Sequence, residues 1–212
     1  MQPETKKTGV APDVIIKELD TAAIKADFPI LSQKVNGYPL VYLDSAASSQ
    51  KPREVINAIL EHYRHNHANI HRGIHTLADR STQAYEATRA HAARFIGGVS
   101  SDEVIFTSGA TDSLNLVAYA WGDLNVHEGD EILITEMEHH ANIVPWYQLA
   151  QRRKAVLKSI PITLCGHLDL SNLDQLITRR TRIVALCHMS NVLGTINPVA
   201  EIAAAAHKMG AL

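Results

Sequence analysis

Short apolar runs alternate with one-sided apolar stretches along most of this chain. The run Ile132-Leu133-Ile134 predicts a buried strand, whereas the apolar residues of Lys51–His67 recur at helical spacing and predict an amphipathic helix. The pattern predicts helices over residues 14–28, 51–67, 81–96, 112–121, 142–153, 171–178 and 198–209. It predicts strands over residues 41–43, 104–107, 131–135, 155–161 and 182–188.

This repeated alternation of strand and helix predicts the fold class. It is typical of an α/β fold with a mainly parallel sheet and helices on both faces. Residues 1–12 are polar, contain two prolines and are expected to form a mobile tail.

The predicted strand 104–107 runs into a small-residue turn and then into a helix. Thr111 or Asp112 is expected to cap that helix. A helix start offers backbone N–H groups, and small side chains let a phosphate approach them closely. Neither a Walker loop nor the Gly-x-Gly-x-x-Gly motif is present. Both an anion site and an ordinary capped helix fit this segment.

Glu138, His139 and His140 follow the predicted strand 131–135. A helix is expected close behind them, with Asn142 as its N-cap and Pro145 in its first turn. Open α/β sheets bind ligands at the carboxyl ends of their strands, so an imidazole there can stack on a flat cofactor. The alternative is that both histidines are solvated loop residues.

The predicted strand 182–188 also ends in a polar turn, which contains Asn191 and Gly194. The Asn191 amide could donate a hydrogen bond to a ligand oxygen. It could equally do no more than close the turn, because Asn and Gly are common turn residues.

Long blocks of this sequence resemble the SufS-type cysteine desulfurases, which are class-V aminotransferase relatives of pyridoxal-phosphate fold type I. The resemblance begins near Ile24 and continues to the last residue. Its most specific blocks are Tyr42–Ser48, Asn69–Leu77, Met137–Trp146 and Met189–Thr195. It implies that residues 1–30 belong to a small domain and that residues 31–212 form an incomplete large domain that binds the cofactor.

The resemblance also implies which residues contact pyridoxal 5'-phosphate. Ala110 and Thr111 would hold the phosphate, and because Ala110 has no hydroxyl, part of that contact falls to backbone N–H groups and Thr111. His139 would stack on the pyridine ring and take part in proton transfer. Asn191 would hydrogen-bond the ring hydroxyl or the bound amino acid.

The implied substrate is L-cysteine, which the family converts to L-alanine while sulfur moves to an enzyme thiolate as a persulfide for iron–sulfur cluster assembly. Ala46 and Ala47 would line the substrate pocket. His71 and Arg72 would lie near the active site or a dimer seam. The implied partners are a sulfur acceptor of SufE or SufU type and, at full length, a second copy of the chain.

The resemblance places several groups that the family needs beyond residue 212. These are the Asp on the pyridinium nitrogen, the Schiff-base Lys, the nucleophilic Cys and the Arg for the substrate carboxylate. Cys165 and Cys187 do not match the nucleophile's place and are interpreted as inert small hydrophobes. Lys208 is interpreted as a solvated partner of a helix dipole. The chain as given is therefore expected to be an inactive fragment.

Two other function classes stay open. One is another pyridoxal-phosphate enzyme of the superfamily, such as a selenocysteine lyase or an aminotransferase-like protein. The other is a non-catalytic truncated protein that binds a partner. Release of alanine from cysteine would separate the desulfurase from an aminotransferase, and failure to bind the cofactor would favour the binding protein.

Composition agrees with a cytoplasmic protein. The 212 residues are 46% apolar, and the formal net charge of -2 gives no reason to expect nucleic acid or a membrane surface as partner. Two cysteines argue against a disulfide framework. No apolar run reaches the roughly 20 residues that span a bilayer, and the first residues do not form a secretory signal.

His67, His71 and His75 are spaced four apart and invite a zinc interpretation. Gly73 interrupts any helix through them, and no Cys or carboxylate joins them at metal spacing. The sequence therefore predicts no metal site.

Overall fold

The protein is described from a computed structural model, in which residues 19–212 are described. The tail expected over residues 1–12 lies outside the described residues. The chain divides into two compact units, one up to Ala92 and the other from Ala93 to Leu212. The division into domains expected at residue 30 stays a prediction.

The first unit is mainly helical. Its elements are α1 (Thr21–Ala26), η1 (Pro29–Ser32), β1 (Lys34–Val35), β2 (Tyr38–Pro39), α2 (Arg53–Glu61), η2 (His62–Asn66) and α3 (Thr76–Phe95), the last of which continues into the second unit. Asp20 caps α1 by accepting a hydrogen bond from the Ala23 N–H at 2.9 Å. Residues 14–18 of the predicted helix 14–28 lie outside the described residues, and α1 ends before Pro29.

A short hairpin stands where the sequence pattern predicted none. Lys34 pairs with Pro39 and Val35 with Tyr38, and Asn36 and Gly37 both have positive φ. Positive φ at both central residues is the type I′ turn that Asn-Gly favours. The strand predicted over residues 41–43 is wrong, because these residues pair with no strand among residues 19–212 and Leu43 is 92% exposed.

The second unit contains a three-stranded parallel sheet. Its strands β3 (Glu131–Thr135), β4 (Val156–Ile160) and β5 (Thr181–Val184) are arranged in the order β4-β3-β5. The last residue continues the hydrogen bonding beside β5, since Leu212 donates to the Arg182 carbonyl and accepts from the Val184 N–H. The predicted strand 104–107 is wrong: this segment is extended but joins neither sheet formed within residues 19–212.

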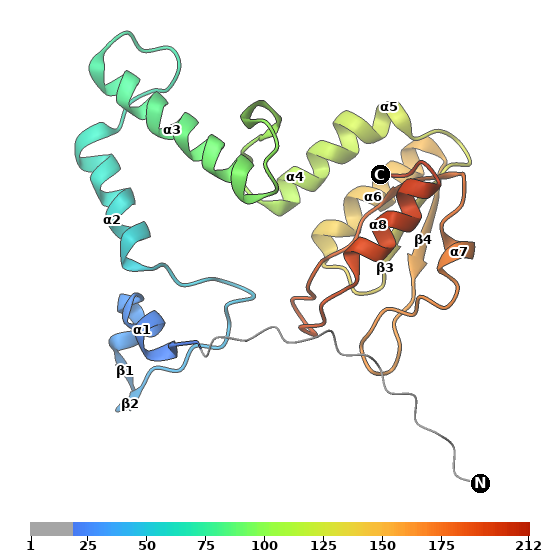
Figure 1. Cartoon of the computed structure of the whole chain (residues 1–212), viewed down its shortest axis with the longest axis horizontal. Coiled ribbons are helices and arrows are strands. Elements are labelled where there is room, and N and C mark those ends of the chain that lie inside the picture. Colours follow the sequence, from blue (N-terminus) through green and yellow to red (C-terminus); the bar gives the residue numbers. More distant parts are fainter. Residues whose placement is uncertain (1–18) are drawn as a thin grey trace. The chain divides into compact units, whose positions relative to one another are not determined.

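The central strand β3 is buried on both faces, which agrees with the predicted layering. Ile132 and Ile134 pack with Trp146 and Leu149 of α6 (Val144–Arg153). Leu133 points the other way and packs with Ile202. That residue belongs to α8 (Val199–Lys208), which shares its face with α7 (Leu173–Leu176) (Figure 1). Helices on both faces of a parallel sheet confirm the predicted α/β class.

A helix precedes the sheet and supports one of its faces. It comprises α4 (Ala110–Val117), the π turn η4 (Ala118–Gly122) and α5 (Asp123–Asn125). Ala118 is buried in the same cluster as Trp146 and Leu149, so this helix and α6 share a core. None of the helices within residues 19–212 is long and apolar enough to cross a membrane.

Candidate functional site

The start of α4 is an open helix terminus. Gly109 is its N-cap, with extended backbone and no side-chain hydrogen bond to the helix. The expectation that Thr111 or Asp112 caps the helix is wrong, because the helix begins at Ala110 and both residues lie inside its first turn. Asp112 accepts hydrogen bonds from the backbone N–H and hydroxyl of Ser108 instead.

This terminus has room for an anion. Apart from the adjoining residues, no atom lies within 4 Å of the place where a Cβ on Gly109 would sit. Backbone N–H groups at the start of a helix attract negative charge, and no side chain caps those of α4. Ala110 and Thr111 therefore stand where a phosphate would meet the backbone.

His139 lies beyond the carboxyl end of β3 and caps the short helix η5 (His140–Asn142). Its Nδ1 accepts a hydrogen bond from the Ala141 N–H at 3.1 Å. An accepting Nδ1 carries no proton, so the neutral ring holds its proton on Nε2. The imidazole is exposed, and η5 contacts α4. The elements that carry the phosphate candidates and the stacking candidate are thus neighbours.

Asn142 does not cap the following helix, contrary to the sequence expectation. It lies inside η5, and α6 begins after Ile143, which makes no side-chain cap bond. Pro145 does stand in the first turn of α6, as predicted. The Asn142 side chain has two partners: its Nδ2 donates to Glu138 at 2.7 Å, and its Oδ1 accepts from the Trp146 indole N–H at 2.8 Å.

Glu138 is the centre of a buried hydrogen-bond network that sequence reasoning missed. Its Oε1 accepts from the Thr135 hydroxyl at 2.7 Å and from the Cys187 N–H at 2.8 Å, while Oε2 accepts from Asn142. Part of the network is local in the sequence, since Thr135 and Asn142 lie within four residues of Glu138.

Asn191 lies in the turn that follows β5. The side chain that braces this turn is Ser190, whose hydroxyl accepts from the N–H groups of Val192 and Leu193. Asn191 is exposed. Because β3 and β5 are adjacent and parallel, the segments carrying His139 and Asn191 leave the same edge of the sheet.

Ala46 and Ala47 lie in an exposed turn of the first unit. The Tyr42 hydroxyl closes the segment around them by donating to the carbonyls of Asp44 and Ser48, at 3.1 and 2.6 Å. The turn is therefore held by its own side chain and backbone contacts.

His71 also belongs to the first unit and has an unusual backbone. Its φ is 66°, in the left-handed region that residues other than glycine seldom adopt. Its N–H donates to the Thr82 hydroxyl, and its Nε2 lies 3.4 Å from a Glu86 carboxylate oxygen. Such strained positions cluster at functional sites.

Cys187 lacks the surroundings of an activated nucleophile. Burial raises the pKa of the Cys187 thiol, and the neighbouring Glu138 carboxylate raises it further. A thiol of raised pKa stays protonated and unreactive at neutral pH. Cys187 lies beyond the end of β5 and is only partly buried, and Cys165 is exposed, so neither is a core residue.

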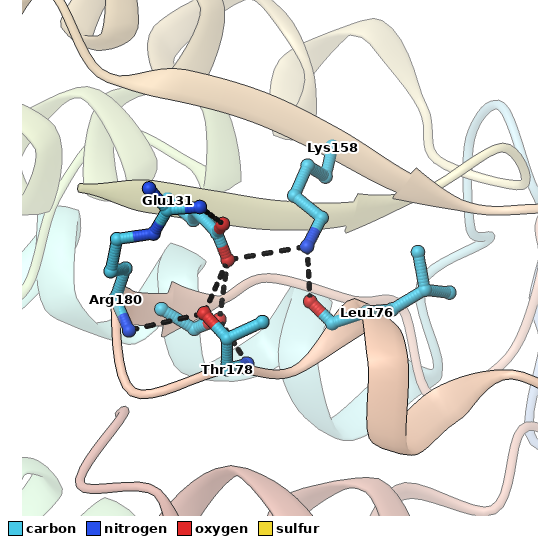
Figure 2. A network of polar contacts seen from close by, with 6 residues as sticks. Glu131, Lys158, Leu176, Thr178 and Arg180 are labelled. Atoms are coloured by element: carbon cyan, nitrogen blue, oxygen red, sulfur yellow. Dashed lines mark hydrogen bonds and ion pairs between the residues drawn. The ribbon is translucent and has the colours of Figure 1, made fainter. Parts of the chain in front are cut away.

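A second polar network lies at the opposite edge of the sheet. Figure 2 shows Glu131, the first residue of β3, between Lys158, Thr178 and Arg180. Because it stands at the amino ends of the strands, it is remote along β3 from His139. Across residues 19–212, no three His, Cys, Asp or Glu side chains are grouped so that they could hold a metal ion.

The sequence matches a known family and its curated members. Residues 41–212 match the family of class-V aminotransferases. The chain is 55% identical over 188 residues to a cysteine desulfurase of Enterobacter sp. (strain 638), covering 89% of this chain and 46% of that protein. It is 53% identical over 187 residues to a cysteine desulfurase of Cronobacter sakazakii, covering 88% and 46%. The chain thus spans about half the length of these relatives.

Solved structures of cysteine desulfurases are also similar to this chain. An apo cysteine desulfurase from Thermococcus onnurineus NA1 superposes with a TM-score of 0.82 at 35% identity, covering 91% of this chain and 46% of that one. The cysteine desulfurase CsdA from Escherichia coli superposes with a TM-score of 0.77 at 37% identity, covering 90% and 47%. A C-DES variant with glycine covalently linked to its PLP cofactor gives 0.70 at 26% identity, covering 87% and 46%.

Proposed function

This chain belongs to the class-V aminotransferase family, and we propose that it is the amino-terminal part of a pyridoxal-phosphate-dependent cysteine desulfurase. The complete enzyme converts L-cysteine to L-alanine and passes the sulfur on as an enzyme persulfide for iron–sulfur cluster assembly. The names of the relatives support the reaction, since those aligned over 187 or 188 residues are cysteine desulfurases.

One observation carries the cofactor assignment. Helix α4, whose start has no side-chain cap, contacts η5, the element capped by His139, and η5 follows the carboxyl end of strand β3 of a parallel sheet. This combines an anion-binding terminus with an exposed flat ring, and pyridoxal phosphate has both a phosphate and a flat ring. The residues present therefore fit the cofactor.

The roles of these residues follow from their chemistry. Pyridoxal phosphate, when bound, supplies an electron sink for reactions of amino acids. The N–H groups at Ala110 and Thr111, together with the Thr111 hydroxyl, would hold the phosphate. The His139 ring would stack on the pyridine ring and offer its Nε2 for proton transfer. The Asn191 amide would donate to the ring hydroxyl or to the bound amino acid.

Ala46, Ala47 and His71 are assigned to substrate binding. Two alanines leave space and add no polar group, which suits a pocket for a small amino acid. His71 has its imidazole beside Glu86 and its backbone in a strained conformation, which supports a functional rather than a purely structural role.

The 212 residues alone are proposed to be catalytically inactive. The reaction needs a lysine for the cofactor, a reactive thiolate and a cation for the substrate carboxylate. Cys187 has a raised pKa, and Lys208 stands in the last turn of α8, where it complements the helix dipole. We place the missing groups on a longer product, which acts in the cytoplasm as a homodimer and passes sulfur to an acceptor of SufE or SufU type.

The first test is a titration of the 212-residue chain with pyridoxal 5'-phosphate, followed by cofactor fluorescence. Saturable binding is expected. Thr111→Ala should weaken it about tenfold, the worth of one hydrogen bond to a charged group. His139→Ala should weaken it several-fold through loss of ring stacking, and His140→Ala, at the neighbouring exposed ring, should leave it unchanged. Absence of saturable binding, or equal effects at His139 and His140, would contradict the cofactor assignment.

A second test addresses the reaction. The product that the source cell makes from this sequence should exceed 23.3 kDa in intact mass and should release alanine from cysteine. Formation of a keto acid instead would indicate an aminotransferase-like enzyme. Preference for selenocysteine would indicate a lyase of that substrate. A product of 23.3 kDa that binds a partner but not the cofactor would indicate a non-catalytic protein.

A further inference from the structure

Glu138 is a buried carboxylate with an unusually complete set of donors. The residue is 9% exposed, and its two oxygens accept three hydrogen bonds of 2.7 to 2.8 Å, from Thr135, Asn142 and Cys187. A buried charge is tolerated only when it is hydrogen-bonded in this way.

These donors come from separate parts of the second unit. Thr135 is the last residue of β3, Asn142 lies in η5, and Cys187 is on the segment that follows β5. Asn142 also accepts a hydrogen bond from Trp146 of α6, a side chain that is 1% exposed. Through these hydrogen bonds, the Glu138 carboxylate connects η5 to the ends of β3 and β5, and Asn142 connects it to the core.

His139 lies between this carboxylate and η5 in the sequence. Its ring accepts a hydrogen bond at Nδ1 from the Ala141 N–H of η5 and lies beside the ring of His140, which also belongs to η5. The place of η5 thus decides both the direction of the ring and which nitrogen carries the proton. The side chain that fixes η5 to the core is Asn142, and the group that holds Asn142 is Glu138.

We propose that Glu138 is a positioning residue that, through Asn142, fixes η5 and thereby presents the His139 imidazole with its proton on Nε2. Its importance for catalysis rests on the proposed function, whereas the positioning of the ring does not. Glu138 acts through other residues and itself touches neither substrate nor cofactor.

The chemistry of the network supplies a selective variant. In Glu138→Gln the amide oxygen can still accept from Thr135 and Cys187, but the amide NH₂ then faces the Asn142 Nδ2, which is also a donor. Only the link to η5 is lost. Adding Asn142→Asp restores it with reversed polarity, because an aspartate carboxylate can accept from both the new glutamine amide and the Trp146 indole N–H.

The experiment measures the ring nitrogens of His139 by NMR in the ¹⁵N-histidine-labelled 212-residue chain, at a pH where the rings are neutral. His139→Gln identifies the signal. The Nε2–H form should dominate in the unchanged chain. Glu138→Gln and Asn142→Ala should each lower the ratio of Nε2–H to Nδ1–H about fivefold, the worth of one typical hydrogen bond. The double variant E138Q/N142D should restore it.

Glu136→Gln is the matched control, since this carboxylate lies in the same turn but is exposed. It should leave the ratio unchanged. Urea unfolding of each variant shows that it is folded, and Asn142→Ala keeps the test valid if Glu138→Gln does not fold. A dominant Nδ1–H form in the unchanged chain, equal effects of E138Q and E136Q, or no rescue by E138Q/N142D would overturn the inference. None of these outcomes depends on cofactor binding or desulfurase activity.

Discussion

Glu131 shows how a buried acid at the amino end of β3 is kept charged. Burial by itself would raise its pKa, but hydrogen bonds from Thr178 and Lys158 and the charge of Lys158 hold the pKa below its ordinary value. Asp130 is similar, because burial is outweighed by Arg182 and by the His127 N–H, so its pKa is also lowered. An acid whose pKa is lower in the folded than in the unfolded state stabilises the fold above its unfolded pKa. This stabilisation is lost as the pH falls through the folded pKa.

Replacement of Glu131 should therefore lower the free energy of unfolding by an amount that depends on pH. Glu131→Gln is expected to lower the free energy of unfolding by about 2 kcal/mol at pH 7, since Lys158, Thr178 and Thr181 lose a charged acceptor. The difference from the unchanged chain should shrink as the pH falls below about 4.3, the ordinary pKa of Glu. Urea unfolding at several pH values measures this.

Glu128→Gln provides the control for that experiment. Glu128 lies 3.7 Å from Lys154, and both side chains are largely exposed. Glu128→Gln should lower the free energy of unfolding by less than about 1 kcal/mol at any pH. A cost of Glu131→Gln that stays constant from neutral to acidic pH would contradict the account of this network.

At the scale of elements, the packing of the π turn η4 against α6 limits what can replace Gly122. This glycine is buried, and a Cβ on it would overlap the Leu149 side chain, which is itself fully buried. The close approach, rather than an unusual backbone angle, requires glycine here. The two helices share the core cluster that covers one face of the sheet.

Gly122→Ala should destabilise the second unit by about 1 to 3 kcal/mol through overpacking. Leu149→Ala should lower the free energy of unfolding by about 2 to 5 kcal/mol because it leaves a cavity. The double variant should lower it by less than the sum of the two single effects, since the new methyl group at residue 122 enters the space that the Leu149 side chain left. Thermal unfolding of the four proteins measures the coupling, and strict additivity would show that the two side chains do not compete for space.

For the whole molecule, the distribution of apolar surface is the most informative property. Helix α2 carries Val55, Ile56, Ile59 and Leu60, each between 41% and 52% exposed. A contiguous apolar stripe of this kind marks a surface that other protein normally covers. The chain spans about half the length of its relatives, and the part of those relatives that it does not match is a natural source of such cover.

The 212-residue chain alone should therefore be poorly soluble or self-associated. Light scattering coupled to gel filtration should give a mass above 23.3 kDa. Ile59→Lys should shift it toward the monomer, whereas Asn57→Lys, which adds the same charge on the same helix, should have little effect. A sharp monomer peak with a cooperative melt for the unchanged chain would contradict this prediction.

The sequence by itself determined the elements whose signals are local. The apolar run of β3, the one-sided pattern of α2 and the start of α6 near Pro145 follow from spacing and turn chemistry among near neighbours. The order of strands and helices was enough to predict a parallel sheet with two covered faces. The resemblance also named His139, but local pattern alone left its role open.

The tertiary structure alone decided where side chains find partners across the fold. Residues 104–107 have the composition of a strand but join neither sheet of the described part of the chain, because a strand depends on a neighbouring strand that its own residues do not encode. Asn142 looked like a helix cap, yet it bonds Glu138 and Trp146. Glu138 in turn depends on Cys187, which is distant in sequence and is brought near by the pairing of β3 with β5. Hydrogen-bond partners of buried groups are set by such long-range pairing, which no local pattern contains.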